Sequence, residues 1–228
     1  MESYLNSMME AVLAPLPGAL GDLAQQMQKA RIGRAQIIES YVPVVAQRLG
    51  EAWIADRLDF GAVTIGAARL QSLVRRLDRE GALGRDVHAY AARGLLLGVP
   101  EGEQHTLGAT VLANQLRSRG ISVHLDLELS VSSLSHRLAR QQFIGVFLSV
   151  SGEQHLESLR SLVACTHYES RSTPVIVGGS ILEHTNDIET RTGADFATCD
   201  LDRAIRNCDI ATGDEAALPH IELPKVGE

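Results

Sequence analysis

Two patterns of apolar and polar residues follow one another along the chain. In residues 1–82, apolar residues recur at intervals of three and four, with few β-branched runs and no alternation of apolar and polar positions. This spacing is typical of helices. From residue 94 onward, short apolar runs alternate with amphipathic segments. The pattern therefore predicts a helical half followed by a half in which strands and helices alternate.

The helical half is expected to form a bundle of four or five helices. One helix should begin after Asp59, a good N-cap residue. At helical intervals, its buried face would carry Phe60, Val63, Ala67, Leu70, Val74 and Leu77. Further helices are predicted near residues 3–13 and 19–40, interrupted at the sequence APLPGALG.

A second clear helix of this half precedes Asp59. Pro43 is tolerated there because it falls in the first turn. Val45, Leu49 and Trp53 then lie along one side at four-residue spacing.

The second half predicts an α/β domain. The apolar runs expected to form strands lie near residues 94–100, 121–127, 143–150, 174–179 and 194–198. The segments expected to form helices lie near 107–119, 132–141, 153–168, 181–191 and 201–208. Such alternation specifies a doubly wound parallel sheet with helices on both faces, of flavodoxin-like or Rossmann-like type.

The predicted domain boundaries follow from the same patterns. A helical bundle is expected over residues 1–82 and the α/β domain over 93–208, joined by a linker near 80–94. Residues 209–228 have lost periodicity and are expected to form an irregular tail.

Charge and cysteine content narrow the class of protein. A net charge of −7 and a pI near 5.6 argue against direct DNA binding, and the adjacent arginines in residues 73–80 are followed at once by acids.

Three irregularly spaced cysteines suit a reducing compartment and are expected to be ordinary buried or half-buried thiols. No apolar run has membrane-spanning length, and the start lacks a secretory signal. A cytoplasmic protein is the expectation.

Polar and glycine motifs stand at three of the predicted strand ends. Glu103 and His105 follow the first strand, Ser149 ends the third, and Gly178 and Gly179 end the fourth. Ligands of such sheets bind beyond the carboxyl ends of the strands. An imidazole suits a transition metal, and a carboxylate two residues away can accept its other ring N–H. The three motifs together predict a metal or cofactor site at this edge.

This arrangement resembles the B12-binding domain family. Its signature is Asp-x-His-x-x-Gly, Ser-x-Leu and Gly-Gly, with spacers of about forty and somewhat under thirty residues. Here the corresponding spacers are residues 109–148 and 152–177, which are 40 and 26 residues long. The sequence departs from the signature twice, since Glu103 replaces Asp and Ser151 replaces Leu. Gene-regulatory members of the family resemble the variant with Glu.

The resemblance implies a role for each motif. His105 would be the lower axial ligand of cobalt, with Glu103 as its partner. Either Ser149 or Ser151 would face the nucleotide tail of the cofactor in a slot between the sheet and its flanking helices. The segment after His105 and the glycine pair would also contact the cofactor, through Thr106, Leu107, Gly108, Gly178 and Gly179. The expected form is hydroxo- or aquocobalamin or adenosylcobalamin.

Residues 48–77 resemble the helical bundle that covers the corrin in related sensors. The whole pattern is most similar to the PpaA/AerR family of photosynthesis-gene antirepressors. Trp53, the only tryptophan, would lie over the cofactor; the alternative is a core residue. In light sensors of the CarH type, Glu and His follow this Trp by ten and eleven residues, and that His becomes an upper ligand. Val63 and Thr64 occupy those positions here, so an aquo or hydroxo upper ligand, or one from elsewhere, is expected.

The resemblance implies a regulatory sensor and not an enzyme. Its partner would be a DNA-bound repressor of the CrtJ/PpsR type, with no membrane involved. The competing hypotheses are a corrinoid subunit that carries a methyl group between methyltransferases, and a haem-binding sensor that uses the same histidine. Of the other histidines, His155 is the one whose loop position allows an approach to the corrin.

Overall fold

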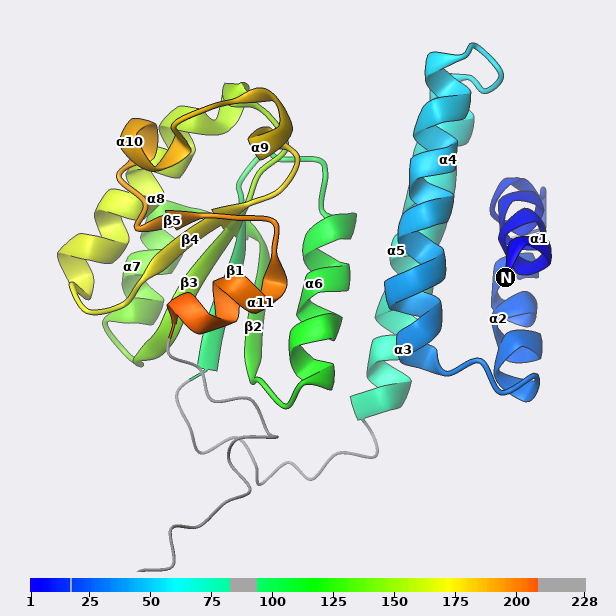
Figure 1. Ribbon diagram of the computed structural model, residues 1–228, viewed down its shortest axis with the longest axis horizontal. Helices are drawn as coiled ribbons and strands as arrows, with labels where there is room; N and C mark the ends of the chain where they lie inside the picture. The colour runs from blue at the N-terminus through cyan, green and yellow to red at the C-terminus, as the bar shows by residue number, and fades with distance from the viewer. Residues whose placement is uncertain (17, 83–93, 209–228) are drawn as a thin grey trace, which may run out of the picture.

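The computed structural model describes residues 1–16, 18–82 and 94–208. It contains a helical half and an α/β half that lie side by side (Figure 1). This confirms the predicted fold class. Most of the expected linker and the expected irregular tail, residues 83–93 and 209–228, lie outside the described residues.

The helical half consists of two longer antiparallel helices and several shorter segments (Figure 1). Its elements are α1 (Glu2–Leu13), α2 (Ala19–Lys29), α3 (Arg34–Gln36), the π-helical turn η1 (Ile37–Tyr41), α4 (Val42–Ile54) and α5 (Phe60–Ala82). The helix expected near residues 19–40 is therefore interrupted. The chain leaves α2 at Ala30, and Arg31 takes a left-handed conformation with φ of 65°. That conformation cannot continue a right-handed helix.

The predicted signals at α4 and α5 have the expected local effects. Asp59 Oδ1 accepts a hydrogen bond of 2.7 Å from the backbone N–H of Ala62, so it caps the start of α5. Pro43 lies in the first turn of α4. Within the core of the helical half, Leu49 and Leu70 are fully buried.

The buried apolar face of the hairpin formed by α4 and α5 is shorter than the sequence pattern predicted. Phe60 is 72% exposed and Trp53 is 49% exposed. Phe60 was expected on the buried face, and Trp53 had a core position as one alternative; neither is a core residue. Both lie close to the turn between α4 and α5, at the end of the hairpin. Periodicity identifies the face of a helix but not how far a neighbouring element extends along it.

The α/β half is built on a parallel sheet with the strand order β2-β1-β3-β4-β5. Its strands are β1 (Gly94–Pro100), β2 (Val123–Leu129), β3 (Phe143–Ser149), β4 (Val175–Gly178) and β5 (Phe196–Ala197). β1 is buried along its whole length, as expected for a central strand covered on both faces. The strand order reverses between β1 and β3, and this switch point is where open α/β sheets bind ligands.

Helices cover both faces of the sheet. They are α6 (Leu107–Ser118), α7 (Val131–Leu138), α8 (Leu156–Glu169), α9 (Ile181–His184), α10 (Ile188–Thr192) and α11 (Leu201–Asn207), with a 3₁₀ turn η3 (Glu153–His155) before α8. Helices α6 and α11 pack on one face, and α7, α8 and α10 on the other. The helix expected near residues 181–191 is divided in two because Asp187 has φ of 58°.

The helical half packs against α6 through α5 and η1 (Figure 1). Val111 of α6 is buried in the same apolar core as α4 and α5. This contact places the bundle beside α6, the helix that begins two residues after His105. Within residues 1–16, 18–82 and 94–208, none of the helices combines the length and the apolar character that crossing a bilayer requires.

Candidate functional site

The loop after β1 carries a buried carboxylate. Glu103 is 1% exposed, although its neighbours Gly102 and Gln104 are exposed. Its Oε1 accepts hydrogen bonds of 2.8 Å from the backbone N–H of His105 and 2.8 Å from His105 Nδ1. A buried carboxylate is tolerated only when its oxygens are hydrogen-bonded. Glu103 therefore holds both the backbone and the ring of His105.

The imidazole of His105 is available for coordination. Its side chain is 74% exposed, in contrast to the buried carboxylate that holds it. With Glu103 ionised, Nδ1 carries the proton, which leaves the Nε2 lone pair free for a metal. This is the pairing of carboxylate and imidazole that the sequence predicted.

The end of β3 completes the environment of Glu103. Its Oε2 accepts hydrogen bonds of 2.9 Å from the backbone N–H of Ser151 and 2.5 Å from the Ser151 hydroxyl. His155 Nε2 lies 3.6 Å from the same oxygen. Ser151, which replaces the Leu of the signature, is thus a hydrogen-bond donor to the carboxylate. Glu is one methylene longer than Asp, and here that carboxylate connects the loop after β1 to the loop after β3.

Hydrogen bonding determines the ionisation of Glu103. Burial raises the pKa of the carboxyl group, but the hydrogen bonds from Ser151 and His105 outweigh it and lower the pKa from 4.5 to about 2. The carboxylate is therefore charged at neutral pH. It can accept a hydrogen bond from the Nδ1–H group of His105 throughout the physiological pH range.

The lowered pKa predicts how stability depends on pH. An ionised Glu103 stabilises the fold fully above its ordinary pKa of 4.5, and this stabilisation is lost as the pH falls through about 2. The lowered pKa corresponds to about 3 kcal/mol. In urea titrations of the cofactor-free protein, the difference in unfolding free energy between wild type and Glu103→Gln should shrink as the pH falls below 4.5.

The matched control is Glu183→Gln, which changes an exposed glutamate on α9. It should leave the pH dependence of the unfolding free energy as in the wild type. A difference between Glu103→Gln and wild type that stayed constant over the acidic range would contradict the ionisation of Glu103 described here.

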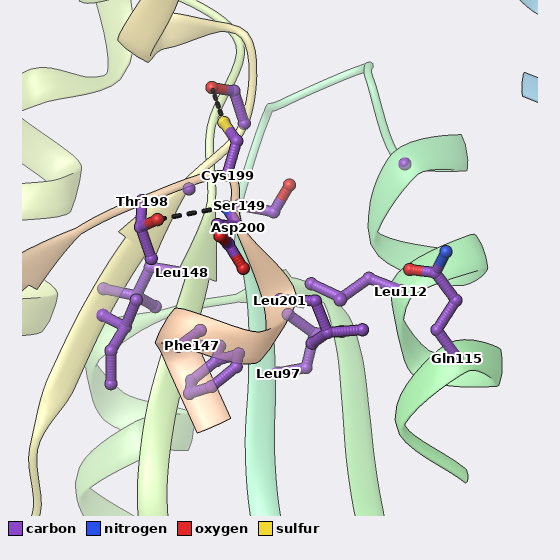
Figure 2. A pocket seen from close by; sticks show the side chains of 15 residues that line it. Leu97, Leu112, Gln115, Phe147, Leu148, Ser149, Thr198, Cys199, Asp200 and Leu201 are labelled. Carbon is purple, nitrogen blue, oxygen red and sulfur yellow. Dashed lines mark hydrogen bonds between the residues drawn. The ribbon is translucent and has the colours of Figure 1, made fainter. Parts of the chain in front are cut away.

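A cavity of about 230 Å³ lies between the sheet and the pair α6 and α11 (Figure 2). Strand residues form its floor, α6 one wall and the segment entering α11 the other. Four residues singled out from the sequence line it: Gly108, Ser149, Gly178 and Gly179. Because Ser149 faces the cavity and Ser151 bonds Glu103, Ser149 is the serine placed to meet a group in this slot.

The glycines of the cavity serve different purposes. A Cβ at Gly108 would meet nothing within 4 Å, so the space beside it is open. Gly179 has φ of 105°, and a Cβ there would approach the backbone oxygen of Val150 to 2.3 Å. A Cβ at Gly178 would lie 3.0 Å from the backbone oxygen of Thr198. The structure requires the glycine pair for close packing of backbone on backbone, and both glycines also line the cavity that they were expected to keep clear.

The other residues named from the sequence lie on the helical half or face it. The Thr106 hydroxyl accepts a hydrogen bond from Gln71 of α5. Leu107 packs against the apolar core of the helical half. Trp53 is outside the lining of the cavity. The Thr64 hydroxyl bonds the backbone oxygen of Phe60 at 2.8 Å within its own helix.

Sequence reasoning missed much of the cavity wall. Leu112 and Gln115 contribute from α6, and Asp200 and Leu201 from the start of α11 (Figure 2). Cys199, expected as a buried or half-buried thiol, is exposed and lines the cavity. A signal did exist, because these last residues follow the fifth predicted strand and its carboxyl end shares the ligand-binding edge.

The fold and the site together define an α/β protein with a cavity of about 230 Å³ and a carboxylate-held histidine at the carboxyl edge of its sheet. The profile of the B12 binding domain family matches residues 93–202. An "uncharacterized 20.5 kDa protein in bchF-crtJ intergenic region" of Rhodobacter capsulatus is 34% identical over 184 residues, which cover 80% of this chain and 95% of the relative. The chain therefore belongs to the B12-binding domain family, as its three motifs predicted. The position of this relative beside crtJ is consistent with the resemblance to PpaA/AerR proteins.

One solved structure shows the same fold. The monomethylamine corrinoid protein of Methanosarcina barkeri superimposes with a TM-score of 0.70 at 14% identity, covering 90% of this chain and 97% of that protein. A cobalamin-binding protein of Desulfitobacterium hafniense DCB-2 matches over 90% of this chain and 97% of its own with 18% identity and a TM-score of 0.47. At these identities the first likeness establishes the fold alone.

Proposed function

We propose that this protein is a cobalamin-dependent regulator that responds to light or redox state and acts through a protein partner. The observation that carries the proposal is the exposed imidazole of His105, held at Nδ1 by the buried, ionised Glu103. Such a pair offers a metal one nitrogen ligand in a fixed tautomer. One protein ligand is sufficient for a metal whose other ligands are supplied by a macrocycle.

The residues around the site fit such a cofactor. His105 would coordinate cobalt from below, and the cavity lined by Gly108 and Ser149 would receive the displaced nucleotide tail. The open space beside Gly108 supports this, since it accepts added atoms without any movement of the chain. When bound, cobalamin would supply the photochemistry or redox chemistry. The chain supplies binding, orientation and a contact with the helical half.

The upper face of the cofactor would be covered by the helical half. Trp53 is 49% exposed, so its indole is free to contact a ligand. Val63 is partly buried against the core of the helical half, and the Thr64 hydroxyl is bonded within α5. These two residues occupy the positions of the CarH-type ligand pair. An aquo or hydroxo upper ligand is therefore part of the proposal.

The partner is proposed to be a DNA-bound repressor of the CrtJ/PpsR type. The relative from Rhodobacter capsulatus is described by its position between bchF and crtJ. A net charge of −7 also suits a protein partner better than direct contact with DNA. On this proposal the chain is a regulator of gene expression and not an enzyme.

The test measures the affinity of such a repressor for its operator by fluorescence anisotropy. The cobalamin-loaded protein is added in the dark or after illumination, or with cobalt reduced or oxidised. We expect the repressor's affinity to differ about tenfold between the two states of one of these pairs, within the usual range of coupling between sites. The His105→Ala protein should show no such difference. Equal repressor affinity in all states would contradict the regulatory function.

A corrinoid methyl carrier is the second candidate, because the fold superimposes on a monomethylamine corrinoid protein. The two functions are separated by reducing the cobalt, offering a methyl donor and then a thiol acceptor. Methyl transfer to the thiol would favour the carrier. Haem, the third candidate, is distinguished from cobalamin by the absorption spectrum of the purified protein.

A further inference from the structure

A direct hydrogen bond joins the helical half to the loop that carries His105. Gln71, in the middle of α5, donates from Nε2 to the hydroxyl oxygen of Thr106 at 2.6 Å, in a partly buried position. Thr106 is the residue after His105 and the N-cap of α6. The contact therefore lies one residue from the imidazole.

The Thr106 hydroxyl is used in an unusual way. Threonine at an N-cap ordinarily accepts a hydrogen bond from the second or third N–H of its own helix. Thr106 makes no such side-chain cap, and its φ and ψ of −95° and −10° lie in the helical region and not in the extended region typical of a cap. The start of α6 is instead held from outside by Gln71. The hydroxyl of the residue next to His105 is thus bonded to the helical half and not to an N–H of its own helix.

The rest of this contact between halves is also rich in polar groups. Asp78 of α5 accepts hydrogen bonds from Asn114 at 3.0 Å and from Arg117 at 2.6 Å. The buried Oδ1 of Asn114 has no hydrogen-bond partner within the structure. Polar contacts between domains can be exchanged for water or for other polar contacts at modest net cost. Val111 and Leu107 of α6 also pack into the apolar core of the helical half, so the polar bonds are the part of this contact that can rearrange most readily.

We propose that Gln71 is a positioning residue that couples the His105 loop to the helical half through Thr106. A change in the position of His105 moves Thr106, which then strains or breaks the bond to α5. In the opposite direction, a shift of α5 alters how His105 is presented. Only the role of this coupling in partner control rests on the proposed function.

The first test uses the cofactor-free protein. Hydrogen exchange of the backbone amides in residues 101–106 is compared in wild type, Gln71→Leu and Thr106→Val. Both variants should raise the exchange rates by a similar factor, roughly threefold to tenfold for the loss of one hydrogen bond. The double variant should exchange no faster than either single variant, because both remove the same bond.

The matched control is Gln47→Leu. Gln47 donates a hydrogen bond of 2.9 Å to Glu51 on the exposed surface of α4. This control removes a glutamine hydrogen bond from the same half without touching the His105 loop. It should leave exchange in residues 101–106 unchanged. Additive effects of Gln71→Leu and Thr106→Val, or unchanged exchange in Gln71→Leu, would overturn the coupling.

The second test uses the cobalamin-loaded protein. Gln71→Leu should retain nitrogen ligation of cobalt by His105, yet lose most of the difference in repressor affinity between the two states. A Gln71→Leu protein with the full wild-type difference overturns the regulatory role of the coupling. If the wild-type protein itself shows no difference, the proposed function fails, while the exchange experiment still decides whether Gln71 positions the loop.

Discussion

Replacement of His105 by alanine is expected to remove the protein nitrogen from cobalt and to weaken cobalamin binding by at least about a hundredfold. Loss of a residue that merely orients a metal ligand typically costs about 10- to 100-fold in affinity, and loss of the ligand itself should cost no less. The variant should fold normally because the side chain is 74% exposed. Its buried partner Glu103 keeps its bonds to Ser151 and to the backbone N–H of residue 105.

Electron paramagnetic resonance of the divalent cobalt state measures this ligation directly. Protein is prepared with histidine labelled with the heavy nitrogen isotope. Ligation by a protein imidazole then changes the nitrogen splitting of the cobalt signal, whereas ligation by the cofactor's own base does not. His184→Ala, which removes an exposed histidine on α9, is the control and should bind as the wild type does. Isotope-sensitive splitting that persisted in His105→Ala would refute the assignment.

Replacement of Gly108 by leucine is expected to weaken cobalamin binding without destabilising the fold. Gly108 lines the cavity of about 230 Å³ and a Cβ added to it would meet nothing within 4 Å, so the leucine side chain has room in the cofactor-free protein. Leucine also favours a helix over glycine by roughly 0.5–1 kcal/mol. The melting temperature should therefore be maintained or raised. Overpacking against a bound tail costs about 1–3 kcal/mol, so cobalamin affinity should fall by about 5- to 150-fold.

Gly50→Leu is the matched control for this prediction. Gly50 is also a helical glycine whose added Cβ would meet nothing within 4 Å, but it lies on α4 in the helical half. This variant should gain similar helical stability and keep wild-type affinity for cobalamin. If Gly108→Leu binds cobalamin as tightly as Gly50→Leu does, the cavity does not receive the tail.

Local signals predicted much of the fold. The apolar runs placed the central strands to within two residues at each end, because buried strands exclude polar residues over their whole length. The N-cap at Asp59 and the first-turn position of Pro43 followed from chemistry that acts within four residues. Breaks at Arg31 and Asp187 were missed, since neither residue type requires the left-handed conformation that it adopts.

The residues of the candidate site were predictable, but the hydrogen bonds between its loops were less so. Spacing alone brought Glu103, His105 and Ser149 to one edge of the sheet, because parallel strands end on the same side. The two-residue interval between Glu103 and His105 also predicted their hydrogen bond, which the structure contains. The role of Ser151 was left open. Its bond to Glu103 spans 48 positions of the chain, and no periodicity reports such a contact.

The amino-acid pattern was enough to predict the class of protein: a helical half, a doubly wound α/β half and a histidine beside a carboxylate at the ligand-binding edge. These features depend on periodicity and on residue types a few positions apart. Three features were visible only in the folded chain: Glu103 bridges two loops, α11 closes the cavity, and Gln71 contacts the residue beside His105. Such contacts join segments distant in sequence, and they arise from how helices pack on the sheet, which local patterns do not encode.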